Sequence, residues 1–218
     1  MAQATASSRR GDRRRAFLLD AAIAVFMEAG YAGASMDRIV QRAGGSKATL
    51  YRYFPSKADL FAAIIETLVA QMTAPIDRRA VSATGDLAAT LTAFARTYLD
   101  VLLEPRSLAL YRMVMGEGGR FPDLGQVFFD RGPGRVVQQL AAYLRDCGWE
   151  RAGVPTELPA REFLSLVRAD LHLRALLGVG VADAAARSRA VDRAVAQFLA
   201  QSPSGGAGGA GTCAKCDH

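Results

Sequence analysis

The stretch SMDRIVQRAGGSKATLYRYF, residues 35–54, contains two short helical patterns separated by two glycines. Ser35 and Ser46 each stand directly before one of these patterns, and serine is a preferred residue at helix N-caps. The apolar positions of the two patterns are Ile39, Val40 and Ala43, followed by Leu50 and Phe54. Because Gly44 and Gly45 end the first pattern, the stretch predicts two helices joined by a tight turn.

A longer helix is predicted on each side of this pair. An apolar repeat of helical spacing begins near Asp12, and Gly30 is expected to end that helix as a left-handed cap. Ser56, followed three residues later by Asp59, resembles a capping box and begins a helix that ends at Pro75. Two short helices backed by a longer one form a helix-turn-helix, and a single helix fits the DNA major groove. The pattern therefore indicates DNA binding.

The distribution of charge supports an anionic partner for the N-terminal part. The 218 residues carry a formal charge of +6. Residues 1–57 hold ten basic and four acidic side chains, so the whole positive excess lies there. A protein that coats DNA regardless of sequence would need basic charge throughout, and the neutral remainder argues against that class. The outward positions of the second short helix include Lys47 and Arg52, and Lys57 begins the next helix, where free N–H groups favour a phosphate.

Several other classes are not favoured. The charge-free apolar stretches are far shorter than the ~20 residues of a membrane helix, and the polar, Arg-rich start does not fit a signal peptide. Three cysteines, Cys147, Cys213 and Cys216, fit a reducing compartment, so we expect a cytoplasmic protein with no membrane association. The two histidines, His172 and His218, supply no nucleophile–base set, so no enzyme and no cofactor are expected. The C-terminal Cys and His residues offer at most three ligands on a tail, and no metal site is predicted.

The remainder of the chain also has helical spacing, which gives an all-α fold of about nine helices. The further helices are predicted near 86–103, 106–116, 124–146 with a break at 132–134, 160–177 and 183–199. We expect a disordered basic arm at 1–11, a DNA-binding domain at 12–62, a ligand-binding and dimerisation domain at 63–201 and a flexible tail at 202–218. Arg9 and Arg10 either reach into a minor groove or only solubilise the chain end, whereas Arg13–Arg15 begin the first helix and are expected to contact phosphate.

Three segments carry a family resemblance. FMEAGY (26–31), SMDRI (35–39) and AGGSKATLYRYFPSKADLF (43–61) resemble the DNA-binding domain of TetR-family transcriptional repressors. The resemblance implies a homodimer whose N-terminal domains bind a palindromic DNA operator and whose C-terminal domains bind a small-molecule inducer. The DNA-contacting residues that it implies are Ser35, Gly45, Ser46, Lys47, Thr49, Tyr51, Arg52, Tyr53 and Lys57. One position departs, because the family commonly has valine where this chain has Gly45.

The C-terminal half carries a second resemblance. MGEGGRFPDL (115–124) and FFDRGP (128–133) resemble the AcrR/AefR-like subgroup associated with efflux and drug response. Most aromatic residues there are at core spacing, and a minority are expected to line an apolar ligand cavity. The ligand candidates are Met72, Phe94, Tyr98, Tyr111, Phe128 and His172. The last two helices are expected to pair across a two-fold axis through Leu164, Leu171, Val191, Val195 and Phe198. A small apolar or aromatic inducer is predicted, and a metal or protein partner is the alternative.

Overall fold

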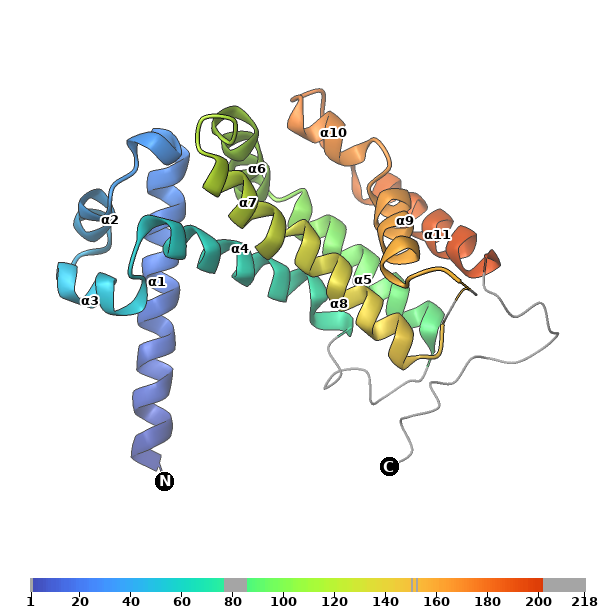
Figure 1. Cartoon of the computed structure of the whole chain (residues 1–218), viewed down its shortest axis with the longest axis horizontal. Helices are drawn as coiled ribbons and strands as arrows, with labels where there is room; N and C mark the ends of the chain where they lie inside the picture. Colours follow the sequence, from blue (N-terminus) through green and yellow to red (C-terminus); the bar gives the residue numbers. More distant parts are fainter. Residues whose placement is uncertain (1, 77–85, 150, 152, 202–218) are drawn as a thin grey trace. The chain divides into compact units, whose positions relative to one another are not determined.

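The computed structural model describes residues 2–76, 86–149, 151 and 153–201, with the backbone alone for 2–10. Within those ranges every regular element is a helix, apart from one isolated bridge between Arg151 and Val154, so the all-α class is confirmed (Figure 1). The helices are α1 (Ala2–Gly33), α2 (Met36–Ala43), α3 (Lys47–Tyr53), α4 (Lys57–Thr73), η1 (Ala74–Ile76), α5 (Leu87–Leu102), α6 (Pro105–Glu117), α7 (Pro122–Arg131), α8 (Pro133–Asp146), α9 (Glu157–Arg168), α10 (Leu171–Leu176) and α11 (Ala184–Ala200). The predicted tail at 202–218, with its two cysteines and His218, lies outside the described residues.

The chain divides into two compact units whose boundary differs from the predicted one. The first comprises Met1–Thr67 and Ala109–Arg131, and the second comprises Leu68–Leu108 and Gly132–His218. The end of α6 and all of α7 therefore belong with the helix-turn-helix, although the sequence predicted a ligand domain from residue 63. The reason is a set of contacts across the sequence, including Arg131 Nη1 to Glu66 Oε1 at 2.6 Å. Helical spacing identifies helices but not their partners.

The two ends of α1 can each be compared with a prediction from the sequence. The prediction of disorder at 1–11 is wrong for residues 2–11, because α1 begins at Ala2. Ala2, Ala4 and Ala6 favour helix, and adding residues to an existing helix needs no new nucleus. At the other end Gly30 has φ 68° and ψ 179°, so it interrupts the helical backbone where the sequence predicted a stop.

The core of the first unit is formed by the apolar faces of α1 to α4. Its most buried large side chains are Leu18, Phe26, Ile39, Leu50, Leu60, Phe61 and Ile64. Phe26 and Phe61 meet edge to face with ring centroids 5.9 Å apart, which joins α1 to α4. Leu50 and Phe54 point inward as predicted, so α3 is held by this core and its remaining side chains are left outside.

The core of the second unit contains a row of stacked rings. Phe163 lies 6.3 Å from Phe94 and 5.0 Å from Phe198 between ring centroids, and Phe198 lies 4.6 Å from Trp149. These rings tie α5, α9 and α11 to the segment after α8. The predicted break inside 124–146 is present, because α7 ends at Arg131 and α8 begins at Pro133.

The predicted dimer face requires a correction. Four of its five residues, Leu164, Val191, Val195 and Phe198, are at most 7% exposed in a single copy of the chain. They leave almost no surface for a second copy and instead pack the protomer core. An apolar stripe at helical spacing identifies a buried face, but not whether the same chain buries it. Leu171 alone remains partly exposed, at the start of α10, where the predicted helix 160–177 is broken at Ala169 (φ 43°).

Two helical segments, Gly11–Gly33 and Lys57–Ile76, are long and apolar enough to cross a membrane by length and composition alone. Core helices of folded proteins meet the same criterion. More than half of the second segment is buried inside the protein, at 56%. In the first, Leu18, Ala22 and Phe26 are at most 1% exposed. The second segment is therefore accounted for as a core helix, whereas 33% of the first is buried, on the face that carries these three residues.

Candidate nucleic-acid interface

The helix-turn-helix is built on two serine caps. The Ser35 side-chain oxygen accepts a hydrogen bond from the Arg38 N–H at 3.3 Å, and this confirms Ser35 as the N-cap of α2. The Ser46 oxygen accepts from the Thr49 N–H at 3.2 Å and caps α3 in the same way. Each cap depends on a hydrogen bond between residues only three positions apart, so the local sequence was sufficient to predict both caps.

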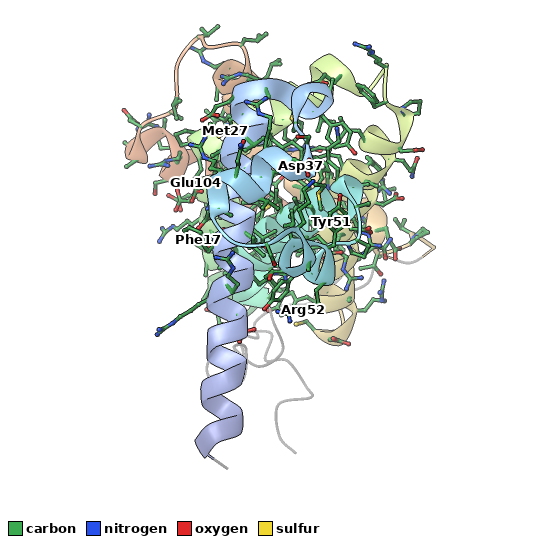
Figure 2. All side chains as sticks on the ribbon, turned by 90° about the vertical axis from the view of Figure 1, so that its left-hand side faces the viewer. Phe17, Met27, Asp37, Tyr51, Arg52 and Glu104 are labelled. Carbon is green, nitrogen blue, oxygen red and sulfur yellow. The ribbon has the colours of Figure 1, made fainter. Side chains whose placement is uncertain are left out.

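The outer face of α3 is polar and exposed. Lys47, Ala48, Tyr51 and Arg52 are exposed, and Tyr51 retains 46% of its surface although it is aromatic. Figure 2, in which the helix-turn-helix side faces the viewer, labels Tyr51 and Arg52 on this short helix. Such a face can offer hydrogen-bond donors and a flat ring to a DNA groove and its phosphates. Lys47, Tyr51 and Arg52 of this face are among the residues for which the family resemblance implied DNA contacts.

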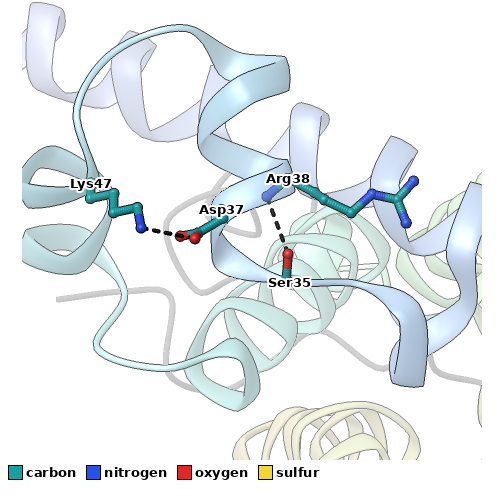
Figure 3. Close-up of polar contacts among 4 residues, drawn as sticks. All are labelled: Ser35, Asp37, Arg38 and Lys47. Carbon is teal, nitrogen blue, oxygen red and sulfur yellow. Dashed lines mark hydrogen bonds and ion pairs between the residues drawn. The ribbon is translucent and has the colours of Figure 1, made fainter.

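Lys47 forms an ion pair across the helix-turn-helix. Its Nζ donates to Asp37 Oδ2 at 2.8 Å, which joins the first residue of α3 to the first turn of α2 (Figure 3). The hydrogen bond to Asp37 and the charge of that carboxylate raise the pKa of Lys47. Lys47 was predicted to contact DNA, but nothing in the sequence pattern indicated this partner ten residues earlier. Asp37 is thus a second charged residue of the site.

Gly45 leaves room for an arginine from α1. The Arg14 guanidinium donates to the Gly44 carbonyl at the C-terminal end of α2. Gly45 has φ 124°, and a Cβ atom built on it would collide with that guanidinium. Glycine suits position 45 mainly because this φ disfavours any side chain, and a Cβ atom there would also move the flexible end of Arg14.

The basic start of α1 lies against α3. The Tyr53 hydroxyl donates to the Gly11 carbonyl at 3.4 Å, and the Arg15 guanidinium lies 5.6 Å from the centre of the Phe54 ring. Arg14 and Arg15 are therefore positioned by the helix-turn-helix. Tyr53 is one of the residues predicted to contact DNA, and in the structure its hydroxyl is directed at α1.

Lys57 also differs from its predicted role. Its Nζ donates to the carbonyls of Tyr31 at 2.6 Å and of Ala34 at 3.1 Å, and it lies 4.3 Å from the centre of the Tyr31 ring. Burial lowers the pKa of Lys57, and the charge of Glu117 opposes that shift. A cation at the last carbonyls of a helix is a stabilising cap. In the structure Lys57 therefore caps the end of α1, and its predicted contact with a DNA phosphate stays a prediction.

The predicted ligand residues are divided between the two units. Tyr111 and Phe128 belong to the first unit, where their rings meet edge to face at 4.8 Å. The second unit contains the other four, of which Phe94 and Tyr98 stack at 6.0 Å. The remaining two, Met72 and His172, are each 7% exposed. Burial, followed by the charge of Arg168, lowers the pKa of His172 to about 4.

A cavity of about 310 Å³ lies elsewhere in the second unit, between the end of α4, η1 and α8. Its lining consists of Ala70, Thr73, Ala74, Ile76, Gln139, Ala142, Tyr143 and Asp146. The Oε1 atom of Gln139 is buried there without a hydrogen-bond partner in the described part of the chain. Little in the sequence indicates this cavity, because small alanines and not aromatic residues form much of its wall. Within the described residues, no three His, Cys, Asp or Glu side chains are grouped as metal ligands.

Two family models match the chain. "Bacterial regulatory proteins, tetR family" matches residues 18–64, and "AefR-like transcriptional repressor, C-terminal domain" matches residues 89–201. The first covers the caps, the turn and α3 described above. The second covers more than half of the chain and includes the segments that resembled the AefR-like subgroup.

Individual relatives agree with these matches. The transcriptional activator FasR of Mycolicibacterium smegmatis is 38% identical over 91 residues, and the repressor KstR of Mycobacterium tuberculosis is 34% identical over 82. The aligned parts span 42% and 38% of this chain and only 41% and 37% of those two proteins.

Solved structures match over nearly the whole chain. The flavonoid-responsive regulator FrrA is 33% identical with a TM-score of 0.68, covering 88% of this chain and 99% of its own. A TetR-family regulator of Mesorhizobium loti is 28% identical with a TM-score of 0.69, covering 88% and 97%. Proteins of this kind are transcription factors and not enzymes. The chain belongs to the TetR family of DNA-binding transcriptional regulators.

Proposed function

We propose that this protein is a cytoplasmic, ligand-responsive repressor that binds a palindromic operator as a homodimer and is released by a small apolar or aromatic inducer. The observation that carries the proposal is the exposed face of α3, with Lys47, Tyr51 and Arg52, on a capped helix-turn-helix. The AefR-like repressor match over residues 89–201 favours repression, although an activator is among the relatives. Ser35, Ser46 and Thr49 are the further polar residues proposed to contact the operator.

Selection from a random duplex library tests operator binding directly. It should yield a near-palindrome with half-sites about one helical turn apart, because two symmetric α3 helices enter successive major grooves. Footprinting upstream of the protein's own gene should then protect a matching site. Arg52→Ala should weaken operator binding by about 1–3 kcal/mol. Arg120→Ala, which removes an equal charge from an exposed position outside the helix-turn-helix, should have little effect. Failure of the wild-type chain to enrich any symmetric sequence would contradict the proposal.

The inducer is proposed to bind in the cavity beside Gln139. The cavity volume of about 310 Å³ is at the small end of the range for ligand sites, and its alanines and Ile76 offer apolar contact. Gln139 lines the cavity, and its side-chain amide is the polar group proposed to bind a ligand O–H or N–H. A flavonoid is a suitable first probe because FrrA, a relative by structure, is flavonoid-responsive. The phenolic rings of a flavonoid supply both an apolar surface and O–H donors.

Titration of the operator complex with a flavonoid tests this site. The compound should release DNA, and operator DNA should weaken flavonoid binding by the same factor, typically 1–3 kcal/mol of coupling. Gln139→Leu should weaken flavonoid binding and leave operator affinity unchanged. Gln126→Leu, on an exposed face of α7, is the control. Equal responses of both variants would place the inducer elsewhere.

The dimer is proposed to form through the exposed faces of α9 and α11. A groove of about 690 Å³ lies there, lined by Arg151, Glu162, Ser165, Leu166, Ala169, Arg193, Gln197 and Gln201. Ser165→Arg adds a third cation beside Arg151 and Arg193, so in a two-fold pair it should weaken association by about tenfold or more. Ala93→Arg on the exposed face of α5 is the control. Sedimentation equilibrium measures the dimer dissociation constant of both variants. Equal dissociation constants would contradict the proposal that this face forms the dimer.

A further inference from the structure

The carboxylate of Glu117, the last residue of α6, binds two successive peptide groups at the end of α1. Glu117 Oε1 accepts from the Tyr31 N–H and Oε2 accepts from the Ala32 N–H, each at 2.8 Å. Tyr31 and Ala32 precede Glu117 by 86 and 85 positions in the sequence, and all three residues lie in the first unit. Hydrogen bonds to a carboxylate are about twice as strong as neutral ones. The contact is therefore a specific two-point attachment of α6 to α1.

Gly30 makes this attachment possible. Because its backbone leaves the helical region at φ 68° and ψ 179°, the helix restarts after it, and the first N–H groups of a restarted turn have no acceptor within the helix. Glu117 supplies those acceptors. A Cβ atom on Gly30 would collide with Glu117 Oε1, so this position requires glycine both for its φ and for the approach of the carboxylate.

Lys57, at the start of α4, binds the same short segment through its carbonyls. It donates to the Tyr31 and Ala34 carbonyls, so an anion from α6 and a cation from α4 hold residues 31–34. The Tyr31 ring adds apolar contact, with centroids 5.8, 5.9 and 5.7 Å from those of Phe26, Phe61 and Phe121. Segment 31–34 ends directly at Ser35, the cap of α2.

We propose that Glu117 is a positioning residue for DNA binding. By fixing segment 31–34, it fixes the start of α2, and α2 is the helix against which α3 and its Lys47–Asp37 pair are set. An operator with two half-sites requires both recognition helices in register, so a loosened junction lowers the population that can bind both at once. The inference rests on the proposed operator binding. It adds a residue that lies outside residues 18–64, the range matched by the DNA-binding family model.

The test compares operator binding with random-sequence binding in the full-length chain. The operator is first selected with the wild-type protein, and the affinity for it is divided by the affinity for a random duplex of equal length. Glu117→Ala should reduce this ratio by about tenfold or more, because two charge-assisted hydrogen bonds are lost. Glu117→Gln keeps one acceptor and should give a smaller reduction. Asp123→Asn removes the same charge from an exposed position in the first turn of α7 and should leave the ratio within about twofold.

The ratio separates positioning from a simple loss of folded protein, which would lower both affinities together. Gly30→Ala disturbs the same contact from its other side, so its effect should be less than additive with Glu117→Ala. Amide hydrogen exchange at Tyr31 and Ala32 should accelerate in Glu117→Gln. A ratio for Glu117→Ala and Glu117→Gln equal to that of Asp123→Asn would overturn the inference while leaving the proposed function intact. Failure of the wild-type chain to select an operator would instead overturn the proposed function and, with it, this role.

Discussion

The ammonium group of Lys47 and the carboxylate of Asp37 lie 2.8 Å apart, so the first residue of the proposed recognition helix carries its own counter-charge. Both side chains are 62% exposed and accessible to solvent and ions. A phosphate that approaches Lys47 must compete with Asp37, and the carboxylate itself repels the phosphate. Because non-specific DNA binding depends mainly on phosphate neutralisation, the pair should suppress sequence-independent binding more than operator binding.

Asp37→Asn should therefore tighten binding to random duplex DNA. If the released Lys47 neutralises one further phosphate, the slope of log affinity against log salt should become steeper by about 0.9. Glu28→Gln is the matched control, because it removes the same charge and releases Arg42 at the other end of α2. Fluorescence anisotropy over a range of salt concentrations measures both slopes. Identical changes in the two variants would show that only net charge matters.

A second prediction concerns the two adjacent glycines of the turn. Gly44 (φ 59°) and Gly45 (φ 124°) both disfavour a side chain, but only at Gly45 would a methyl group meet Arg14. Gly44→Ala should cost about 1–2 kcal/mol of stability from backbone strain, and Gly45→Ala should cost more.

Urea denaturation measures these costs, and Arg14→Ala provides the check. In the Arg14→Ala background, the cost of Gly45→Ala should fall while that of Gly44→Ala stays the same. If the cost of Gly45→Ala is unaffected by Arg14, the guanidinium does not explain the glycine.

Features that depend on neighbouring residues were predictable from the sequence. Ser35 and Ser46 cap helices through hydrogen bonds that span three residues, and Leu50 faces inward because of its helical spacing. The family resemblance added the function of this segment. For these features the sequence around each residue contains the whole physical cause.

Features that depend on distant partners were not predictable. Lys57 has the sequence position of a phosphate ligand, but its acceptors are carbonyls more than twenty residues earlier. Val195 and Phe198 belong to an apolar stripe that fits a dimer face equally well, and only the packing of α11 on α5 and α9 decides the matter. Glu117 accepts hydrogen bonds from backbone N–H groups, and no pattern of side chains in the sequence indicates such a contact.

The corrected position of Lys57 leads to a third prediction. Lys57→Met removes the cation that caps the Tyr31 and Ala34 carbonyls, so it should lower the free energy of unfolding by about 1–3 kcal/mol. The salt dependence of random-duplex binding should stay unchanged, since Lys57 is not expected to neutralise a phosphate. Thermal denaturation and anisotropy titrations measure the two effects. A slope reduced by about 1 with unchanged stability would restore the phosphate role that the sequence predicted.

The last prediction concerns the acid sensitivity of the second unit. Burial, followed by the charge of Arg168, lowers the pKa of His172 from its ordinary value of 6.5 to about 4 in the folded chain. Between these two pH values the unfolded chain binds a proton that the folded chain excludes, so stability must fall as the pH decreases from 6.5 toward 4. His172→Gln keeps a polar side chain of similar size but removes the titration, so its stability should fall less over the same window. Urea denaturation of both proteins at pH 7.5, 6 and 5 gives the comparison, and the contributions of the carboxylates largely cancel in the difference. Parallel curves for the two proteins would mean that His172 is protonated equally in the folded and unfolded states.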